Sequence, residues 1–320
     1  YGKMNFAPTD PNLGAAAGTI LLLLAVVSLW LYRLTLRKAG RFVTISGKGH
    51  KTEPMALGAL RLPIFGLLLL VVFISTLLPL AAVLFRALLT IRVTFLRDVQ
   101  FGFDNFAQIL NAPSFEVAFK NSMILGVGSA VLCAALGWAV AYQLLKRRSS
   151  TMVATDYLIA LPIAIPGTVF GIGMLWGYVF TPVYLTIWIL LIAFVTRYAV
   201  YAVRMFTNGM LQLDKSLEEA GATAGAGPRA VLSRITLPLL KPVLASVILL
   251  IFLTIMRELS TSIILYGFDT VTMPILTWSR LEDGFYGEAS AFSLVQLAIV
   301  FVCVLILQRV LGAELKTGTR

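Results

Sequence analysis

The stretch from Leu213 to Pro242, LDKSLEEAGATAGAGPRAVLSRITLPLLKP, is polar and lies between two long apolar runs. Its charged residues are Asp214, Lys215, Glu218, Glu219, Arg229, Arg234 and Lys241. Ser216 followed by Glu219 fits a capping box, which predicts that a short helix starts at this point. Gly225, Gly227 and Pro228 then predict a break in that helix. We therefore expect a short helix, a turn and a second helix that leads into the next apolar run.

The composition of the chain is that of a membrane protein. The 320 residues are 59% hydrophobic and 13% charged, and the mean hydropathy is +0.90. Soluble proteins carry about 25% charged residues. The net charge is +11, but the basic residues cluster beside the apolar runs, which fits membrane orientation better than nucleic-acid binding. The expected fold is all-α, a polytopic helical membrane protein with no nucleic-acid partner.

Seven apolar runs are long enough to cross a bilayer. Each has about 20 residues or more, the length that a hydrocarbon core of about 30 Å requires. The predicted spans lie near residues 14–32, 62–84, 118–145, 153–180, 183–206, 240–266 and 289–311.

Basic residues between the spans predict the orientation. The loop 33–61 holds seven Lys and Arg residues against one acidic residue, which places it on the cytoplasmic side. Alternation of the spans then places the basic segment 146–148, the stretch 207–239 and the C-terminus inside, and 267–288 outside. The loop 85–117 fits less well, since it is predicted outside yet carries three arginines. The N-terminus is also predicted outside, as expected for a chain cut from a longer one.

The fourth predicted span contains residues that bend helices or let them pack closely. Pro162 and Pro166 lie within one apolar run, and prolines kink spanning helices. Two glycine pairs, Gly167/Gly171 and Gly173/Gly177, have the spacing that allows close helix contact. This span is either a helix that packs tightly and does not move or a helix at an interface that moves.

The sixth predicted span carries two adjacent ionisable residues, Arg257 and Glu258, roughly 22 Å from its cytoplasmic entry at 1.5 Å per residue. Charged groups at such a depth face the bundle interior or water. Neighbouring residues on a helix do not face each other, so we expect separate partners, with Arg197 a candidate for Glu258. The group, with Ser260 and Tyr266, is either a structural ion-pair network or the lining of a substrate path or gate.

Metal and cofactor sites are not indicated. The two cysteines, Cys133 and Cys303, lie inside apolar runs, and the one histidine, His50, lies in a basic loop. No Cys/His group has the spacing of metal ligands, so we expect this chain to bind no metal and no cofactor.

The polar stretch resembles the EAA loop of permease subunits of binding-protein-dependent ABC importers, the MetI-like superfamily. That motif is EAA, three residues, Gly, nine residues and I-x-LP. Here the matching residues are Glu219, Ala220, Gly221, Gly225, Ile235, Leu237 and Pro238. One departure is Gly221, which stands where the family has a second alanine and weakens a helix by up to about 1 kcal/mol.

The resemblance extends beyond the loop. LPIAIPGTVFGIG at 161–173 looks like the proline-glycine helix of the superfamily. FDNFAQIL at 103–110, followed by Asn121-Ser122, resembles the segment that leads into the conserved core of that superfamily. RELSTSIILYG at 257–267 and the linker 40–49 look like fused ferric-iron-type permeases, which carry two halves in one chain. The resemblance then implies two parts. These are 1–61, the last span of a preceding half plus a cytoplasmic linker, and 62–313, the permease domain with its coupling loop at 213–242.

The resemblance also implies function and partners. The Glu219-Ala220-Gly221 helix would dock on a cytoplasmic ATPase subunit dimer, which would hold ATP-Mg, because this chain has no G-x-x-x-x-G-K-[ST] run. An extracytoplasmic binding protein would deliver the substrate, ferric iron or alternatively 2-aminoethylphosphonate or another small anion. The chain would be a non-catalytic permease in the lipid of the bacterial inner membrane, paired with a second permease half.

Three other classes of protein fit the composition less well. An ion-gradient-driven secondary transporter would have no docked ATPase, so co-purification of an ATPase distinguishes it. A membrane enzyme would need clustered carboxylates or metal ligands. A scaffold without transport would need neither the glycine-rich span nor the charges at depth.

Overall fold

The computed structural model of the chain describes residues 20, 27, 58–90, 100–146 and 150–316. Within these ranges the chain consists of helices and their connections. The single β-type contact found there is an isolated bridge between Leu89 and Phe101. The predicted all-α class is therefore confirmed.

The described part of the chain contains up to six candidate spans, judged by length and composition. Four helical segments are long and apolar enough to cross a membrane: Arg61–Leu88, Pro113–Leu145, Ile187–Leu211 and Tyr286–Ile306. Two bent pairs also qualify: Ala154–Ala164 with Gly167–Tyr178, and Pro228–Leu239 with Lys241–Ile255. These six correspond to six of the seven predicted spans. The predicted span at 14–32 lies outside the described residues, apart from 20 and 27.

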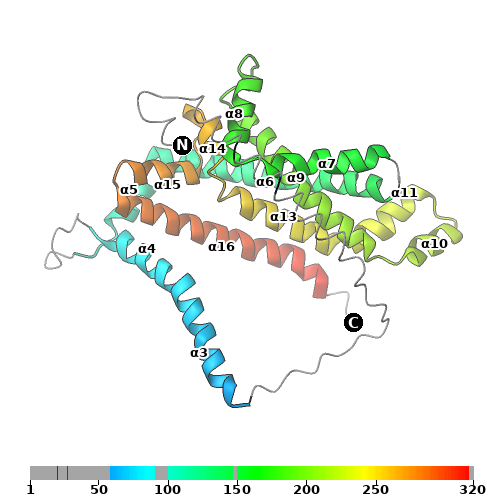
Figure 1. Ribbon diagram of the computed structural model, residues 1–320, viewed down its shortest axis with the longest axis horizontal. Coiled ribbons are helices and arrows are strands. Elements are labelled where there is room, and N and C mark those ends of the chain that lie inside the picture. The colour runs from blue at the N-terminus through cyan, green and yellow to red at the C-terminus, as the bar shows by residue number, and fades with distance from the viewer. Residues whose placement is uncertain (1–19, 21–26, 28–57, 91–99, 147–149, 317–320) are drawn as a thin grey trace.

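Three helices form the centre of the bundle (Figure 1): α6 (Pro113–Lys146), α9 (Ile187–Leu211) and α13 (Lys241–Ile255). Their facing sides are apolar and fully buried, as at Phe194 and Ile251. Burial of such side chains contributes about 1.5–3 kcal/mol each in water, while in lipid the close packing itself stabilises the contact.

The first described helix leaves this bundle (Figure 1). It comprises α3 (Arg61–Val72), a π-helical turn (Phe73–Leu77) and α4 (Leu78–Leu88), and α4 packs on α16 (Tyr286–Lys316). No residue of α3 is buried.

The two ends of the bundle carry different short helices (Figure 1). One end has α10 (Lys215–Thr223) and α11 (Pro228–Val231), and the other has α5 (Asp104–Leu110) and α15 (Met273–Glu282).

Asn121 and Ser122 of α6 fix the end that carries α15. Asn121 Nδ2 donates to the carbonyls of Asp269 and Val271, both at 2.9 Å. The backbone N–H of Met273 donates to Ser122 Oγ at 2.9 Å. These bonds tie the loop before α15 to α6.

The fourth predicted span is not one helix. It is α7 (Ser150–Ala164) and α8 (Gly167–Tyr178), which meet at an angle of 107°. Pro166 has an extended backbone (φ −53°, ψ 139°) at the junction, and a residue before proline also avoids helical geometry. The expected kink is thus a break between two helices that bends the chain by slightly more than a right angle.

The sixth predicted span also ends earlier than expected. Helix α13 stops at Ile255, and the next helical turn is α14 (Ser262–Leu265). Arg257 and Glu258 therefore lie in a non-helical connection. The Glu258 carboxylate accepts the backbone N–H groups of Thr261 and Ser262, which offers the backbone an alternative to helical bonds.

Candidate functional site

The first candidate site is the predicted coupling loop, residues 213–242, called the coupling loop below. Helix α10 begins after Asp214, whose Oδ1 accepts the backbone N–H of Ser216 at 3.0 Å. The predicted capping box at Ser216 and Glu219 is wrong, because Asp214 occupies the capping position two residues earlier. The two hydrogen bonds from Ser216 lower the pKa of the Asp214 carboxyl.

Gly225 ends α10 in a left-handed conformation with φ +86°. Its N–H donates to the Ala222 carbonyl, and the N–H of Ala226 donates to the Gly221 carbonyl, both at 3.0 Å. These two bonds form a Schellman motif, which satisfies carbonyls at the helix end. Glycine adopts this conformation without strain, so the break predicted at Gly225 has a defined geometry.

The two halves of the motif lie in contact. A Cβ added at Gly221 would come within 2.6 Å of Ile235 Cδ1 and 3.3 Å of Val231 Cγ2. Ile235 belongs to a π-helical turn, Leu232–Thr236, that follows α11. The glycine that departs from the family motif therefore provides room for the isoleucine of the same motif. Leu237 and Pro238 come next and are exposed in α12 (Leu237–Leu239).

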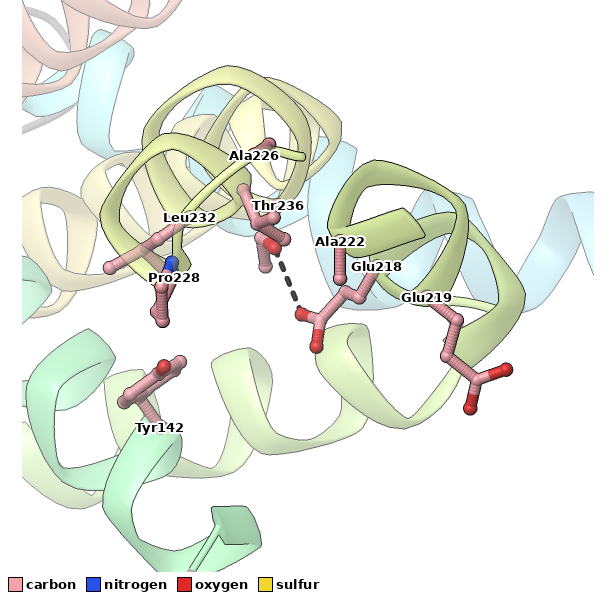
Figure 2. A pocket seen from close by; sticks show the side chains of 9 residues that line it. Tyr142, Glu218, Glu219, Ala222, Ala226, Pro228, Leu232 and Thr236 are labelled. Carbon is pink, nitrogen blue, oxygen red and sulfur yellow. Dashed lines mark hydrogen bonds between the residues drawn. The ribbon is translucent and has the colours of Figure 1, made fainter. Parts of the chain in front are cut away.

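The two glutamates of α10 differ in direction (Figure 2). Glu218 Oε1 accepts a hydrogen bond from Thr236 Oγ1 at 2.9 Å, across a hollow that Tyr142 of α6 also lines. The Glu219 carboxylate points away from Thr236. A larger hollow of about 650 Å³ continues from these residues toward the end of α9. Of the two carboxylates, Glu219 is thus the exposed one, as are Ala220 and Gly225.

The second candidate site is a polar junction, which we define as Gly167, Arg197, Glu258, Ser260 and Thr261. The guanidinium of Arg197, which is 7% exposed, donates to Thr261 Oγ1 at 3.2 Å. Glu258, 6% exposed, accepts the Thr261 N–H at 3.0 Å and the Ser260 hydroxyl at 2.6 Å. The suggested Arg197–Glu258 ion pair is not formed. The two charged groups instead bond to different atoms of Thr261, Arg197 to its hydroxyl and Glu258 to its backbone N–H.

Helix α8 packs directly on this junction. A Cβ added at Gly167 would overlap Ser260 and come within 2.9 Å of Arg197 Nη1. The Arg197 guanidinium also lies over the Phe170 ring, 5.6 Å from its centroid. A Cβ added at Gly171 would lie 3.0 Å from Cβ of Ile264 in α14.

The second glycine pair of α8 behaves differently. A Cβ added at Gly173 or Gly177 would have no neighbour within 4 Å in the described chain. Of the two predicted pairs, only Gly167 and Gly171 therefore make close contact there.

Arg257 does not join the polar junction. It is exposed and lines a separate pocket between α4, α15 and α16. Tyr266 is half-buried after α14, and its backbone N–H donates to the Ser262 carbonyl. Of the four residues predicted for a substrate path, Glu258 and Ser260 thus meet in the junction, while Arg257 and Tyr266 lie elsewhere.

Two residues of these sites are not singled out by the sequence. Glu218 is one of several charged residues in the loop. The sequence signal that could have distinguished it is its position, because consecutive residues on a helix point about 100° apart, so Glu218 and Glu219 face different directions. Thr261 is only a polar neighbour of Glu258 in the sequence, and it becomes central because α13 ends before it.

The family model described as "Binding-protein-dependent transport system inner membrane component" matches residues 126–317. The ferric transport system permease protein FbpB of Actinobacillus pleuropneumoniae is 28% identical over 220 residues, which are 67% of this chain and 32% of that protein. A putative 2-aminoethylphosphonate transport system permease protein, PhnV of Salmonella typhi, is 25% identical over 235 residues, 73% of this chain and 89% of that protein.

The chain is similar in fold to a bacterial alginate ABC transporter solved in complex with an alginate pentasaccharide-bound periplasmic protein. The TM-score is 0.63 at 18% identity, and the match covers 78% of this chain and 92% of that chain. The chain spans about a third of the length of the ferric permeases that it matches.

Proposed function

Because the chain belongs to the family of binding-protein-dependent transport system inner membrane components, we propose that it is the permease of an ATP-driven importer. In this proposal it crosses the bacterial inner membrane, hydrolyses nothing itself and couples to a cytoplasmic ATPase dimer that binds ATP-Mg. A soluble binding protein outside delivers the substrate, and a second permease half completes the path.

The geometry of the coupling loop is the observation that carries this proposal. Helix α10 stands at one end of the bundle, and both of its ends are fixed, by the Asp214 cap and by the Schellman motif. Its outer side presents small residues and the exposed carboxylate of Glu219, which suit insertion into a cleft of a partner. Because Gly221 packs on Ile235, a force on α10 would be transmitted to the segment that leads into α13.

The polar junction is the proposed moving part. It joins three parts of the chain around the buried residues Arg197, Glu258 and Thr261: the start of α8, the middle of α9 and the connection after α13. Switching between inward-open and outward-open states needs packed elements that have two arrangements. The bond between Arg197 and Thr261 is the contact that we expect to change between these states.

A charge reversal at Glu219 tests the docking. We expect Glu219→Lys to weaken co-purification of the ATPase with the permease and to lower substrate-stimulated ATP hydrolysis at least tenfold, the effect of about 1.4 kcal/mol. The readouts are the ratio of ATPase to permease after purification and the ATPase rate in nanodiscs.

The matched control is Glu282→Lys, the same change at an exposed position at the other end of the bundle. It should leave the ratio of ATPase to permease unchanged. Equal ratios for wild type and Glu219→Lys would contradict the docking proposal. A wild-type permease that takes up substrate from an ion gradient with no ATPase bound would instead indicate a secondary transporter.

The relatives include ferric, 2-aminoethylphosphonate and putrescine permeases, and the proposed substrates are the first two of these, ferric iron and 2-aminoethylphosphonate. The expected assay loads the candidate binding protein with each in turn and compares stimulated ATPase activity. Stimulation by the iron-loaded form alone would support a ferric importer, and stimulation by the phosphonate-loaded form would support the alternative.

A further inference from the structure

The pocket that contains Arg257 lies apart from the coupling loop and the polar junction. It has a volume of about 430 Å³. Apolar side chains make part of its wall, and its polar lining consists of Arg257, Thr277, Trp278, Ser290, Ser293 and Gln296. No carboxylate is among its lining residues in the described chain.

The depth of this pocket places it within the outer half of the bundle. Helix α13 has 15 residues and rises roughly 22 Å from the end near the coupling loop before the chain reaches Arg257. On the other side, Ser293 lies seven residues, or roughly 10 Å, into α16 from the end that carries α15. An exposed arginine at this depth is costly in lipid, so it faces a water-filled path or another polar surface.

No neighbour in the described part of the chain neutralises the Arg257 charge. Within the described residues, no hydrogen bond or ion pair engages its guanidinium. The adjacent Glu258 carboxylate is turned into the polar junction, where Ser260, Thr261 and Ser262 donate to it. A positive group therefore stands in a hollow whose other polar groups are hydroxyls, an amide and an indole.

Resting on the proposed importer function, we propose that this pocket binds a small oxyanion, such as a phosphonate, on its way through the permease. A guanidinium presents five N–H donors in a fork that matches the oxygens of such a group. The hydroxyls of Thr277 and Ser293 bond to carbonyls of their own helices and can rotate toward an anion. A bare ferric ion would be repelled here, and the described residues hold no group of three His, Cys, Asp or Glu side chains placed for a metal.

Cysteine labelling tests the pocket directly. Ser293→Cys is introduced into the complete permease with its ATPase, in nanodiscs, after Cys133 and Cys303 are replaced by alanine. The rates of reaction with sulfonatoethyl and trimethylammonioethyl methanethiosulfonate are then compared. Since the Arg257 charge lines the same pocket as the thiol, it attracts the anionic reagent and repels the cationic one, so Arg257→Gln should lower the anion-to-cation rate ratio by about tenfold.

Two variants serve as controls. Arg257→Lys keeps the charge and should keep most of the preference for the anionic reagent. Arg86→Gln removes one positive charge near the same end of the bundle, where Arg86 lies over the Tyr286 ring and does not line the pocket, and should leave the ratio unchanged. Millimolar methylphosphonate should slow the labelling of Ser293→Cys, and should not do so when Arg257→Gln is present.

Three results would overturn the proposal. The first is a Ser293→Cys thiol that reacts with neither reagent, since the pocket would then hold no water. The second is a rate ratio that Arg257→Gln does not change, and the third is labelling that methylphosphonate does not slow. None of these depends on docking. If the permease binds its ATPase but fails this test, only the anion-site proposal is wrong. If it passes this test but binds no ATPase, the proposed importer function is wrong.

Discussion

Single residues fix the shape of the coupling loop. Gly225 holds a φ of +86°, and its N–H and that of Ala226 close the end of α10. No neighbour in the described chain lies within 4 Å of a Cβ position at Gly225, so the requirement for glycine there is conformational and not steric. Gly221 is the opposite case, since its conformation is ordinary and the Ile235 side chain fills the space of a Cβ.

Gly225→Val should disrupt this loop. A β-branched residue in the left-handed region costs about 1–2 kcal/mol or more, which the loop can relieve only by opening the Schellman motif. We expect about tenfold weaker binding of the ATPase subunit, measured by titration of the purified permease.

Gly225→Asn provides the comparison, since asparagine tolerates the left-handed conformation. It should bind the ATPase more tightly than Gly225→Val does. If valine and asparagine weakened binding equally, the backbone conformation would not be the cause.

Helical elements meet at the polar junction because two of them are interrupted. The break at Pro166 brings the start of α8 to Ser260, and the end of α13 at Ile255 frees Thr261 to bind Arg197. Arg197 Nε has no hydrogen-bond partner in the described chain, so the Thr261 bond matters more to this buried cation.

Thr261→Val should destabilise the permease. It removes the acceptor of the Arg197 N–H, and an unsatisfied buried donor costs about 1–3 kcal/mol. We expect the midpoint of thermal unfolding in detergent to fall by several degrees, together with a changed balance of inward-open and outward-open states.

Thr261→Ser keeps the hydroxyl and loses only a methyl group, so it should retain the wild-type midpoint more closely. If the Thr261→Val protein kept the wild-type midpoint and uptake rate, the hydrogen bond between Arg197 and Thr261 would have no role beyond ordinary packing.

At the scale of the whole molecule, one end of the bundle carries α10 and α11, the proposed coupling end, and the opposite end carries α5 and α15 (Figure 1). The basic loops 33–61 and 146–148 of the sequence predict that the coupling end is cytoplasmic. Thr223 at the end of α10 and Asp283 after α15 are both exposed and mark the two ends.

Thr223→Cys and Asp283→Cys should therefore be labelled from opposite sides of the membrane. In inverted vesicles, a membrane-impermeant maleimide should react with Thr223→Cys and not with Asp283→Cys, and right-side-out cells should show the reverse. Labelling of both cysteines from one side would mean that the orientation, and with it the coupling proposal, is wrong.

The sequence by itself determined the all-α membrane class, the positions of six spans and the turn at Gly225. These follow from local signals, since a run of apolar residues determines where a helix can cross the membrane, and a glycine after a short helix determines where that helix ends. The family was also recognisable, because the residues from Glu219 to Pro238 keep a fixed spacing.

The tertiary structure alone decided where α13 ends and which residues meet. The predicted span to 266 does not locate the stop at Ile255. Glu258 accepts backbone N–H groups of residues close to it in sequence, but the connection is also held by Arg197, which binds Thr261, and by α8, which packs on Ser260. In the same way, Arg257 and Glu258 are neighbours in sequence, but the course of the chain turns one into a pocket and the other into the junction. Such choices depend on contacts between residues that are far apart along the chain, and local propensity does not contain them.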